Sequence, residues 1–350
     1  MEMIVLEIKI MEVFMEIDKK VKISSAELAQ LWAQYMNDSG SICVLRFFLE
    51  KAEDPEIRPV IEFALKLSKT HIEKLTVFFK EENYPVPYGF KVEEDVDLNA
   101  PKLYSDSFVL QFIHQMAKIG LTNYSASVAS SVRTDITDYY MECLSETMQL
   151  YKVSKNVLLE KGLYVRSPAI PSEKVEFVNK QAFLFDIIGE KRPLIVAEVS
   201  NLYANTQRNI LGVATLIGFS QVTKDKEVNK FFLKGIDIGK KHIKLFASKL
   251  EEGNLPVPAS LSAEVTTSTS YTFSDKLMMF FTTGLISLSI GYYGTAVAQS
   301  PRMDLGVMYN RLSLEVQMYS EDGSNILINN KWMEQPPMAS DRGELGSENT

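Results

Sequence analysis

An internal repeat covers most of the 350-residue sequence. Residues 68–87 (SKTHIEKLTVFFKEENYPVP) match residues 239–258 (GKKHIKLFASKLEEGNLPVP) at an offset of 171 positions, which holds without gaps over 26–87. After the PVP motif the offset falls to 169 and then holds through the pair Glu146 and Glu315. Fixed-period similarity of this kind decides a fold assignment before any motif does. Because each copy is long enough to bury its own core, the repeat predicts two homologous domains.

Each copy has the pattern of four long helices. Apolar residues recur at helical spacing, and Asp54-Pro55-Glu56 and Ser105-Asp106 are typical helix starts. The first and second helices are joined tightly, as are the third and fourth, whereas about 20 residues separate the second from the third. That connectivity is the ferritin-like version of the four-helix bundle. We therefore predict an all-α chain of two tandem ferritin-like four-helix bundles related by internal duplication.

The repeat also sets the expected domain boundaries. Prolines bracket the segment between the copies, which contains one short amphipathic stretch, and the chain ends in polar and acidic residues. We expect a lead at 1–23, a first bundle at 24–167, a linker with a short helix at 168–193, a second bundle at 194–337 and a disordered tail at 338–350.

Composition excludes several classes of protein. The net charge is −8, and an acidic chain does not favour phosphate neutralisation, so we expect no nucleic-acid partner. Two cysteines cannot form a disulfide framework, which favours a reducing, cytoplasmic setting. The composition leaves open a homo-oligomer or a protein partner.

One segment is long and apolar enough to span a membrane. Residues 277–299 carry no charge, and about 20 such residues suffice to cross a bilayer. The equivalent helix of the first copy, however, carries His114, Lys118 and other polar residues. One position in a duplicated fold should have the same environment in both copies, so we expect no stable membrane insertion and interpret 277–299 as a buried bundle helix. Gly284, Gly291 and Gly294 suggest that neighbouring protein encloses it.

The bundles lack the ligands of a di-iron centre. Such centres need Glu-x-x-His motifs on two helices, and here Ser68 and Gly239 stand three positions before His71 and His242. The third helix of each copy contains neither Asp nor Glu after its first turn. We therefore expect no di-iron centre and no other cofactor.

A smaller set of titratable residues is shared by both copies. One His and two carboxylates could bind a single divalent metal in each bundle. The alternative is that each His bonds a carboxylate inside its bundle and fixes helix register. Arg133 and Arg302 precede two of the acids and are expected to clamp the corner between the third and fourth helices. The candidate metal ligands are Glu27, His71, Asp135, Glu146, Glu198, His242, Asp304 and Glu315.

Three features together resemble one protein family: the tandem duplication, the NYPVP/NLPVP motifs, and YYGTAVAQSPRMDL at 292–305. They resemble the uncharacterised domain-of-unknown-function 3231 family of spore-forming Gram-positive bacteria. The resemblance implies a ferritin-like fold and a cytoplasmic or spore-associated setting, and it implies no established activity. The first copy departs from the last motif, reading NYSASVASSVRTDI at 123–136.

The sequence therefore supports two hypotheses about function. The first is a non-enzymatic structural or binding protein, associated with stress or sporulation. The alternative is a metal- or small-molecule-binding ferritin-like protein with a His/carboxylate site in one or both bundles.

Overall fold

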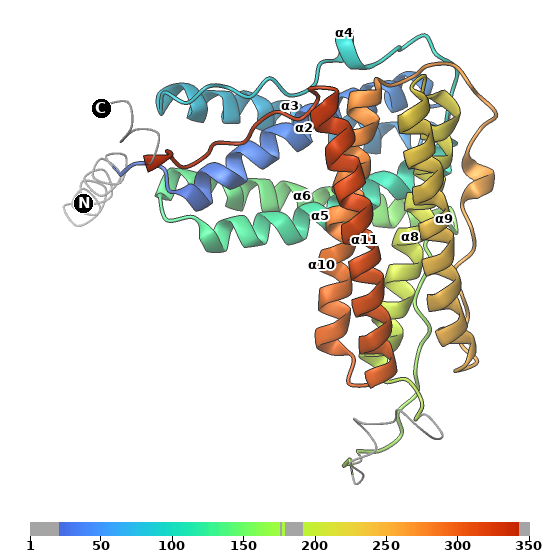
Figure 1. Ribbon diagram of the computed structural model, residues 1–350. Coiled ribbons are helices and arrows are strands. Elements are labelled where there is room, and N and C mark those ends of the chain that lie inside the picture. Colours follow the sequence, from blue (N-terminus) through green and yellow to red (C-terminus); the bar gives the residue numbers. More distant parts are fainter. Residues whose placement is uncertain (1–20, 176, 179–191, 343–350) are drawn as a thin grey trace.

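The computed structural model describes residues 21–175, 177–178 and 192–342, and it confirms an all-α fold with two repeated halves (Figure 1). Most of the expected lead, the short helix expected in the linker and the end of the expected tail lie outside these residues. The long helices are α2 (Ser25–Lys51), α3 (Arg58–Glu81), α5 (Asp106–Ser130) and α6 (Thr134–Glu160) in the first half, and α8 (Val196–Val222), α9 (Lys226–Glu251), α10 (Asp275–Gln299) and α11 (Met303–Asn329) in the second.

Local sequence explains where these helices begin. Ser24 caps α2 in a capping box: its hydroxyl accepts the Glu27 N–H at 3.2 Å, and the Glu27 carboxylate accepts the Ser24 N–H at 2.8 Å. Ser105 and Ser274 cap the third helix of each half, as the sequence predicts.

The start of α3 differs from the prediction. The Asp54 carboxylate accepts backbone N–H bonds as expected, but the helix proper begins at Arg58. Pro59 has no N–H, so the usual bond to the carbonyl four residues earlier cannot form. The second copy has no proline at the equivalent position, and there Asp225 directly caps α9.

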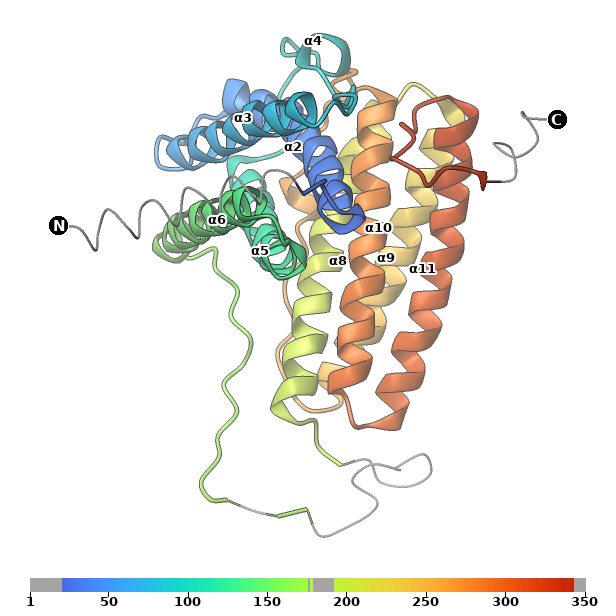
Figure 2. The ribbon, with the colours of Figure 1, turned by 90° about the vertical axis from the view of Figure 1, so that its left-hand side faces the viewer.

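In each half, the first helix packs chiefly against the second and the third against the fourth. The two halves lie across one another, so that α2, α3, α5 and α6 run transverse to the helices of the second half (Figures 1 and 2). One hydrophobic core continues through the seam between them, with ring contacts such as Phe47 with Phe273 at 5.1 Å between centroids.

The long crossover of each half pairs with that of the other half. The first crossover contains the short helix α4 (Val92–Asp95), and the second contains the single turn η1 (Ser262–Glu264). Antiparallel bridges join Val96 to Phe273 and Tyr104 to Val265. Val96 and Val265 are equivalent in the repeat, as are Tyr104 and Phe273, so the two bridges are related by the duplication.

The contacts between the two crossovers also involve the helix caps. The Ser274 hydroxyl, which caps α10, donates to the Asp95 carboxylate of the first half at 2.6 Å. The Ser105 hydroxyl, which caps α5, donates to the Glu264 carboxylate of the second half. Each half thus supplies the acid that fixes the cap of the other half's third helix.

Tyr104 also crosses the seam to reach α8. Its hydroxyl donates to the Thr215 carbonyl at 2.7 Å. A Cβ at Gly218 would lie 2.3 Å from that hydroxyl oxygen, so glycine is required for this close approach. The first-copy equivalent of Gly218 is Phe47, which instead packs against Phe273.

Helix α10 is less enclosed than the sequence suggests. Within the described residues it is the one helix long and apolar enough to span a membrane, and a third of its most apolar window is buried. It packs in the bundle against α8 and α11, which is compatible with a soluble protein. The expectation that protein encloses its glycines is wrong, because Cβ atoms at Gly284, Gly291 and Gly294 would meet nothing within 4 Å. Its buried side is formed by larger residues such as Leu277, Ile286 and Tyr293.

Candidate functional site

The histidine of the first half bridges three helices. His71 on α3 is 3% exposed, and its two ring nitrogens face different carboxylates. Nδ1 lies 3.2 Å from Asp38 on α2, and Nε2 lies 3.3 Å from Glu146 on α6. Gln34, one turn before Asp38, donates to that same carboxylate at 3.2 Å and to the hydroxyl of Tyr124 on α5 at 3.3 Å. The buried network therefore reaches all four helices.

Two opposing effects act on the charge of His71. Burial lowers its pKa, but hydrogen bonding to Asp38 and Cys143 and the negative charge of the Asp38 carboxylate act in the other direction and raise the pKa to about 11. An imidazolium donating from both nitrogens to two carboxylates is a charge-assisted arrangement. His71 is therefore a cation at neutral pH.

His242 occupies the equivalent position in the second half with different partners. Its Nδ1 lies 2.9 Å from the hydroxyl of Tyr293 on α10, and its Nε2 lies 3.1 Å from Glu315 on α11. Burial lowers the pKa of His242, although the hydrogen bond with Glu315 acts against this. The imidazole is therefore neutral at neutral pH.

Differences at two positions account for the two charge states, because Cys143, which also acts to raise the pKa of His71, aligns with Leu312. The repeat aligns Asp38 with Asn209, which is uncharged and donates to Tyr293 at 3.0 Å. Without a carboxylate beside Nδ1, burial dominates in the second half. The duplicated fold thus holds one charged and one neutral histidine at equivalent positions.

The structure divides the eight sequence-predicted residues into two places. His71 lies with Glu146, and His242 lies with Glu315, inside the bundles. The other four residues lie at the corners between the third and fourth helices: Glu27, Asp135, Glu198 and Asp304.

The corner acids hold backbone and arginine groups. Glu27 accepts the N–H groups of Val132 at 2.8 Å and Arg133 at 2.9 Å. Burial raises the pKa of Glu27, but these backbone bonds outweigh it and lower the pKa to about 2. The Arg133 guanidinium donates to Asp135 at 2.7 Å and also to Glu82. This is the corner clamp that the sequence predicts.

The second half has an equivalent corner clamp, in which Arg192 is an additional partner of the glutamate. Glu198 accepts the Arg302 N–H at 3.0 Å and the Arg192 guanidinium at 2.8 Å, while Arg302 donates to Asp304 at 2.8 Å.

This arrangement does not suit a metal ion. A metal would need a lone pair on an imidazole nitrogen together with a nearby carboxylate. Both nitrogens of each histidine already face hydrogen-bond partners, and Asp38 and Glu146 lie on opposite sides of the His71 ring. Across 21–175, 177–178 and 192–342 no group of three or more His, Cys, Asp or Glu side chains is placed to hold a metal. The predicted mononuclear site remains a prediction without structural support.

Sequence reasoning missed Asp38, Gln34 and the tyrosines Tyr124 and Tyr293. The tyrosines recur in both copies, which was a usable signal. Asp38 is not among the titratable residues that both copies share, because the equivalent residue of the second copy is Asn209.

Two cavities lie in the seam beside these networks. The larger is about 220 Å³ and is lined by residues of α2, α5, α6, α8 and α10, among them Gln34, Asp38 and Tyr124. The smaller is about 100 Å³ and is lined by α5 and the four helices of the second half, among them Asn209, His242 and Tyr293. The cavities share a wall, formed by Gln115, Ile119, Leu211, Leu285 and Leu288.

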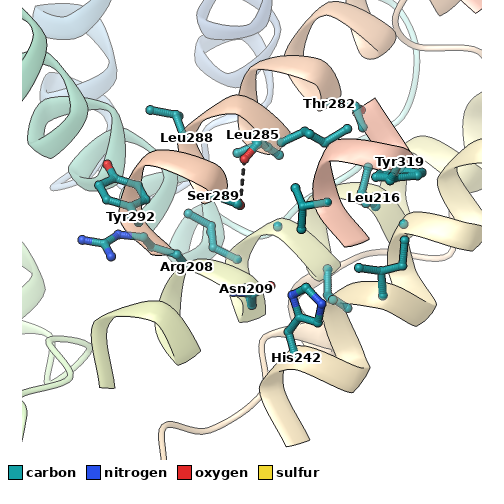
Figure 3. Close-up of a pocket in the computed structure, with 18 of the residues that line it drawn as sticks. Arg208, Asn209, Leu216, His242, Thr282, Leu285, Leu288, Ser289, Tyr292 and Tyr319 are labelled. Atoms are coloured by element: carbon teal, nitrogen blue, oxygen red, sulfur yellow. Dashed lines mark hydrogen bonds between the residues drawn. The ribbon is translucent and has the colours of Figure 1, made fainter. Parts of the chain in front are cut away.

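An arginine–tyrosine pair narrows the smaller cavity. The Arg208 guanidinium lies 3.5 Å from the centroid of the Tyr292 ring, and Figure 3 shows the two side chains together on the side of the cavity away from His242. The first-copy equivalents are Asn37 and Asn123, which are shorter, exposed, and line the larger cavity. The outer edge of the larger cavity is therefore more open.

A family model described as "Protein of unknown function (DUF3231)" matches the chain twice, at residues 11–175 and 182–345. The chain belongs to the DUF3231 family. No curated protein matches it.

One solved structure is similar to half of the chain. It is a crystal structure entitled a "putative spore coat protein" from Bacillus halodurans C-125, with 15% identity, a TM-score of 0.39, and coverage of 45% of this chain and 99% of that one. At that TM-score the match supports no conclusion about function.

Each DUF3231 copy contains one four-helix half, with a buried histidine on its second long helix and an adjoining cavity. The family match places His71 and Asp38 in the first copy and His242 and Asn209 in the second. The two copies share a fold position for the histidine while differing in its charge.

Proposed function

We propose that the protein is a non-enzymatic structural or binding protein whose buried histidine networks fix the register of its helices. The observation that carries this proposal is that the ring nitrogens of His71 and His242 face partners on other helices of the same half. Groups engaged in this way tie helices together and fix their relative positions. Membership of an uncharacterised family is consistent with such a role and does not establish it.

The proposed setting is the cytoplasm or the spore of a spore-forming bacterium. Cys43 and Cys143 are both buried and free, which fits a reducing compartment. The spore association rests on the family resemblance alone. Immunoblotting of separated cytosol, membrane and spore fractions tests the setting, and recovery in the membrane fraction would contradict it.

Metal analysis separates this proposal from the metal-binding alternative. We expect purified protein to contain substoichiometric iron, zinc and manganese, and the variant His71→Ala/His242→Ala to melt at a lower temperature because it loses the buried hydrogen bonds. The matched control is Glu27→Gln/Glu198→Gln, which changes predicted ligands that lie outside the histidine networks. One metal ion per bundle that disappears in the His variant and persists in the control would overturn the structural role.

A further inference from the structure

Two residues that line the larger seam cavity each have a buried polar atom without a hydrogen-bond partner among the described residues. Gln34 is 7% exposed and Tyr140 is fully buried, and both line this cavity. The Gln34 Oε1 atom and the Tyr140 hydroxyl have no hydrogen-bond partner among the described residues. A buried polar group left in this state is costly, so native structures pair such groups with protein, water or a ligand.

The rest of the wall restricts what could occupy the cavity. It is largely apolar, with Phe112, Ile119, Phe280 and Leu285 among its lining residues. The ionic groups of the adjoining network are one imidazolium and two carboxylates, which disfavours an anion. The unpartnered Oε1 atom of Gln34 is an acceptor and requires a donor.

The size of the cavity restricts the occupant further. An apolar cavity of roughly 150 Å³ holds benzene. By the same ratio, about 220 Å³ holds a molecule of roughly nine non-hydrogen atoms. The cavity thus suits an uncharged, mostly apolar molecule with one O–H or N–H group.

We propose that this cavity is a binding site for a small, uncharged, largely apolar ligand that donates one hydrogen bond to Gln34. Three positions around this cavity are smaller than their equivalents in the other copy, two of them in the first half and one, Gly284, on α10 of the second half. Gly284 stands where the first copy has Gln115, and Asn37 and Asn123 stand where the second copy has Arg208 and Tyr292. The inference extends the structural role and does not depend on it.

Two probes of almost equal shape test the hydrogen bond. Indole has an N–H donor and roughly nine non-hydrogen atoms, whereas 1-methylindole has no donor. In calorimetric titrations of the full-length protein we expect indole to bind about tenfold more tightly than 1-methylindole, because only indole pairs with Gln34. No measurable binding of indole, or equal affinity for both probes, would overturn the proposal.

A matched pair of variants tests the location. Gly284 lines the cavity, and Gly284→Gln introduces the side chain that the first copy carries at the equivalent position. Gly294→Gln makes the same change on the same helix outside the cavity, where a Cβ also meets nothing within 4 Å. We expect Gly284→Gln to weaken indole binding at least about tenfold and Gly294→Gln to leave it within about twofold.

Because both glycines face open space, neither change should prevent folding, and far-ultraviolet circular dichroism verifies this for each variant. Equal binding by both variants, or equal loss in both, would place the probe elsewhere and overturn the assignment. Neither result would alter the metal analysis, so failure here is distinguishable from failure of the structural role.

Discussion

The side chains beside the imidazole decide whether the buried histidine is charged. His71 and His242 have similar burial, and each faces a glutamate on the fourth helix. They differ in what meets Nδ1: a carboxylate from Asp38 in the first half and the Tyr293 hydroxyl in the second. The Asp38/Asn209 difference, together with Cys143 in place of Leu312, therefore gives the two copies different electrostatics.

Exchanging Asp38 and Asn209 should shift the two pKa values in opposite directions. We expect Asp38→Asn to bring the pKa of His71 down from about 11, and Asn209→Asp to raise the pKa of His242. The pH titration of the histidine Cε1–H resonances in nuclear magnetic resonance spectra measures both shifts. A wild-type His71 that titrates near its ordinary value of 6.5 would contradict the assignment.

The same difference predicts opposite pH dependences of stability. The raised pKa of His71 contributes stability that is complete below about 6.5 and is lost as pH rises through about 11. The lowered pKa of His242 contributes stability that is present above 6.5 and is lost as pH falls through its folded value. At pH 7 we expect Asp38→Asn to reduce the free energy of unfolding by about 2 kcal/mol, with a smaller loss at pH 11. Urea unfolding at several pH values checks this, and a loss that grows toward pH 11 would contradict it.

At the scale of elements, the crossovers are structural parts rather than loose connections. Asp95 belongs to the first half but bonds the cap of α10 in the second, and Glu264 does the reverse for α5. Both contacts span the seam, so the stability of the first turns of α5 and α10 depends on how the two halves pack together.

Removal of one crossover acid should loosen a helix in the other half. We expect Asp95→Ala to cost about 1 kcal/mol of stability and to speed hydrogen exchange in the first turn of α10. Asp97→Ala is the control, because among the described residues the Asp97 carboxylate accepts a hydrogen bond from the nearby Asn99 N–H and makes no contact with a helix cap. If hydrogen exchange in Asp95→Ala became faster only in the first half, the bond from Ser274 to Asp95 would not stabilise the start of α10.

At the scale of the molecule, the sequence predicts the helices and the repeat better than it predicts how the two halves pack together. The repeat and the helix caps follow from local pattern and spacing, and recurrence in both copies marks His71 and Glu146 as candidate residues without pairing them. The bridge between Val96 and Phe273 does not, because nothing in either segment identifies a partner so distant in sequence. The larger cavity does not follow from the sequence either, since its volume depends on how Gly284 and other residues of the second half meet the first.

A shared core should make the two halves unfold as one unit. Because buried residues of both halves form one hydrophobic cluster, we expect a single calorimetric transition on heating. The double variant Asp95→Ala/Glu264→Ala, which removes both exchanged acids, should lower that transition and broaden it. Two resolved transitions in the wild-type protein would contradict the shared core.

The exchanged caps impose an order on folding during synthesis. The Glu264 carboxylate that holds Ser105 lies 159 residues further along the chain. At synthesis rates of about 5–20 residues per second, the ribosome supplies that carboxylate roughly 8–30 s after the serine. Until then, the first turn of α5 lacks its partner and the seam surface of the first half has nothing to cover it. The nascent chain therefore depends on its own second half, or on a chaperone, to protect that surface.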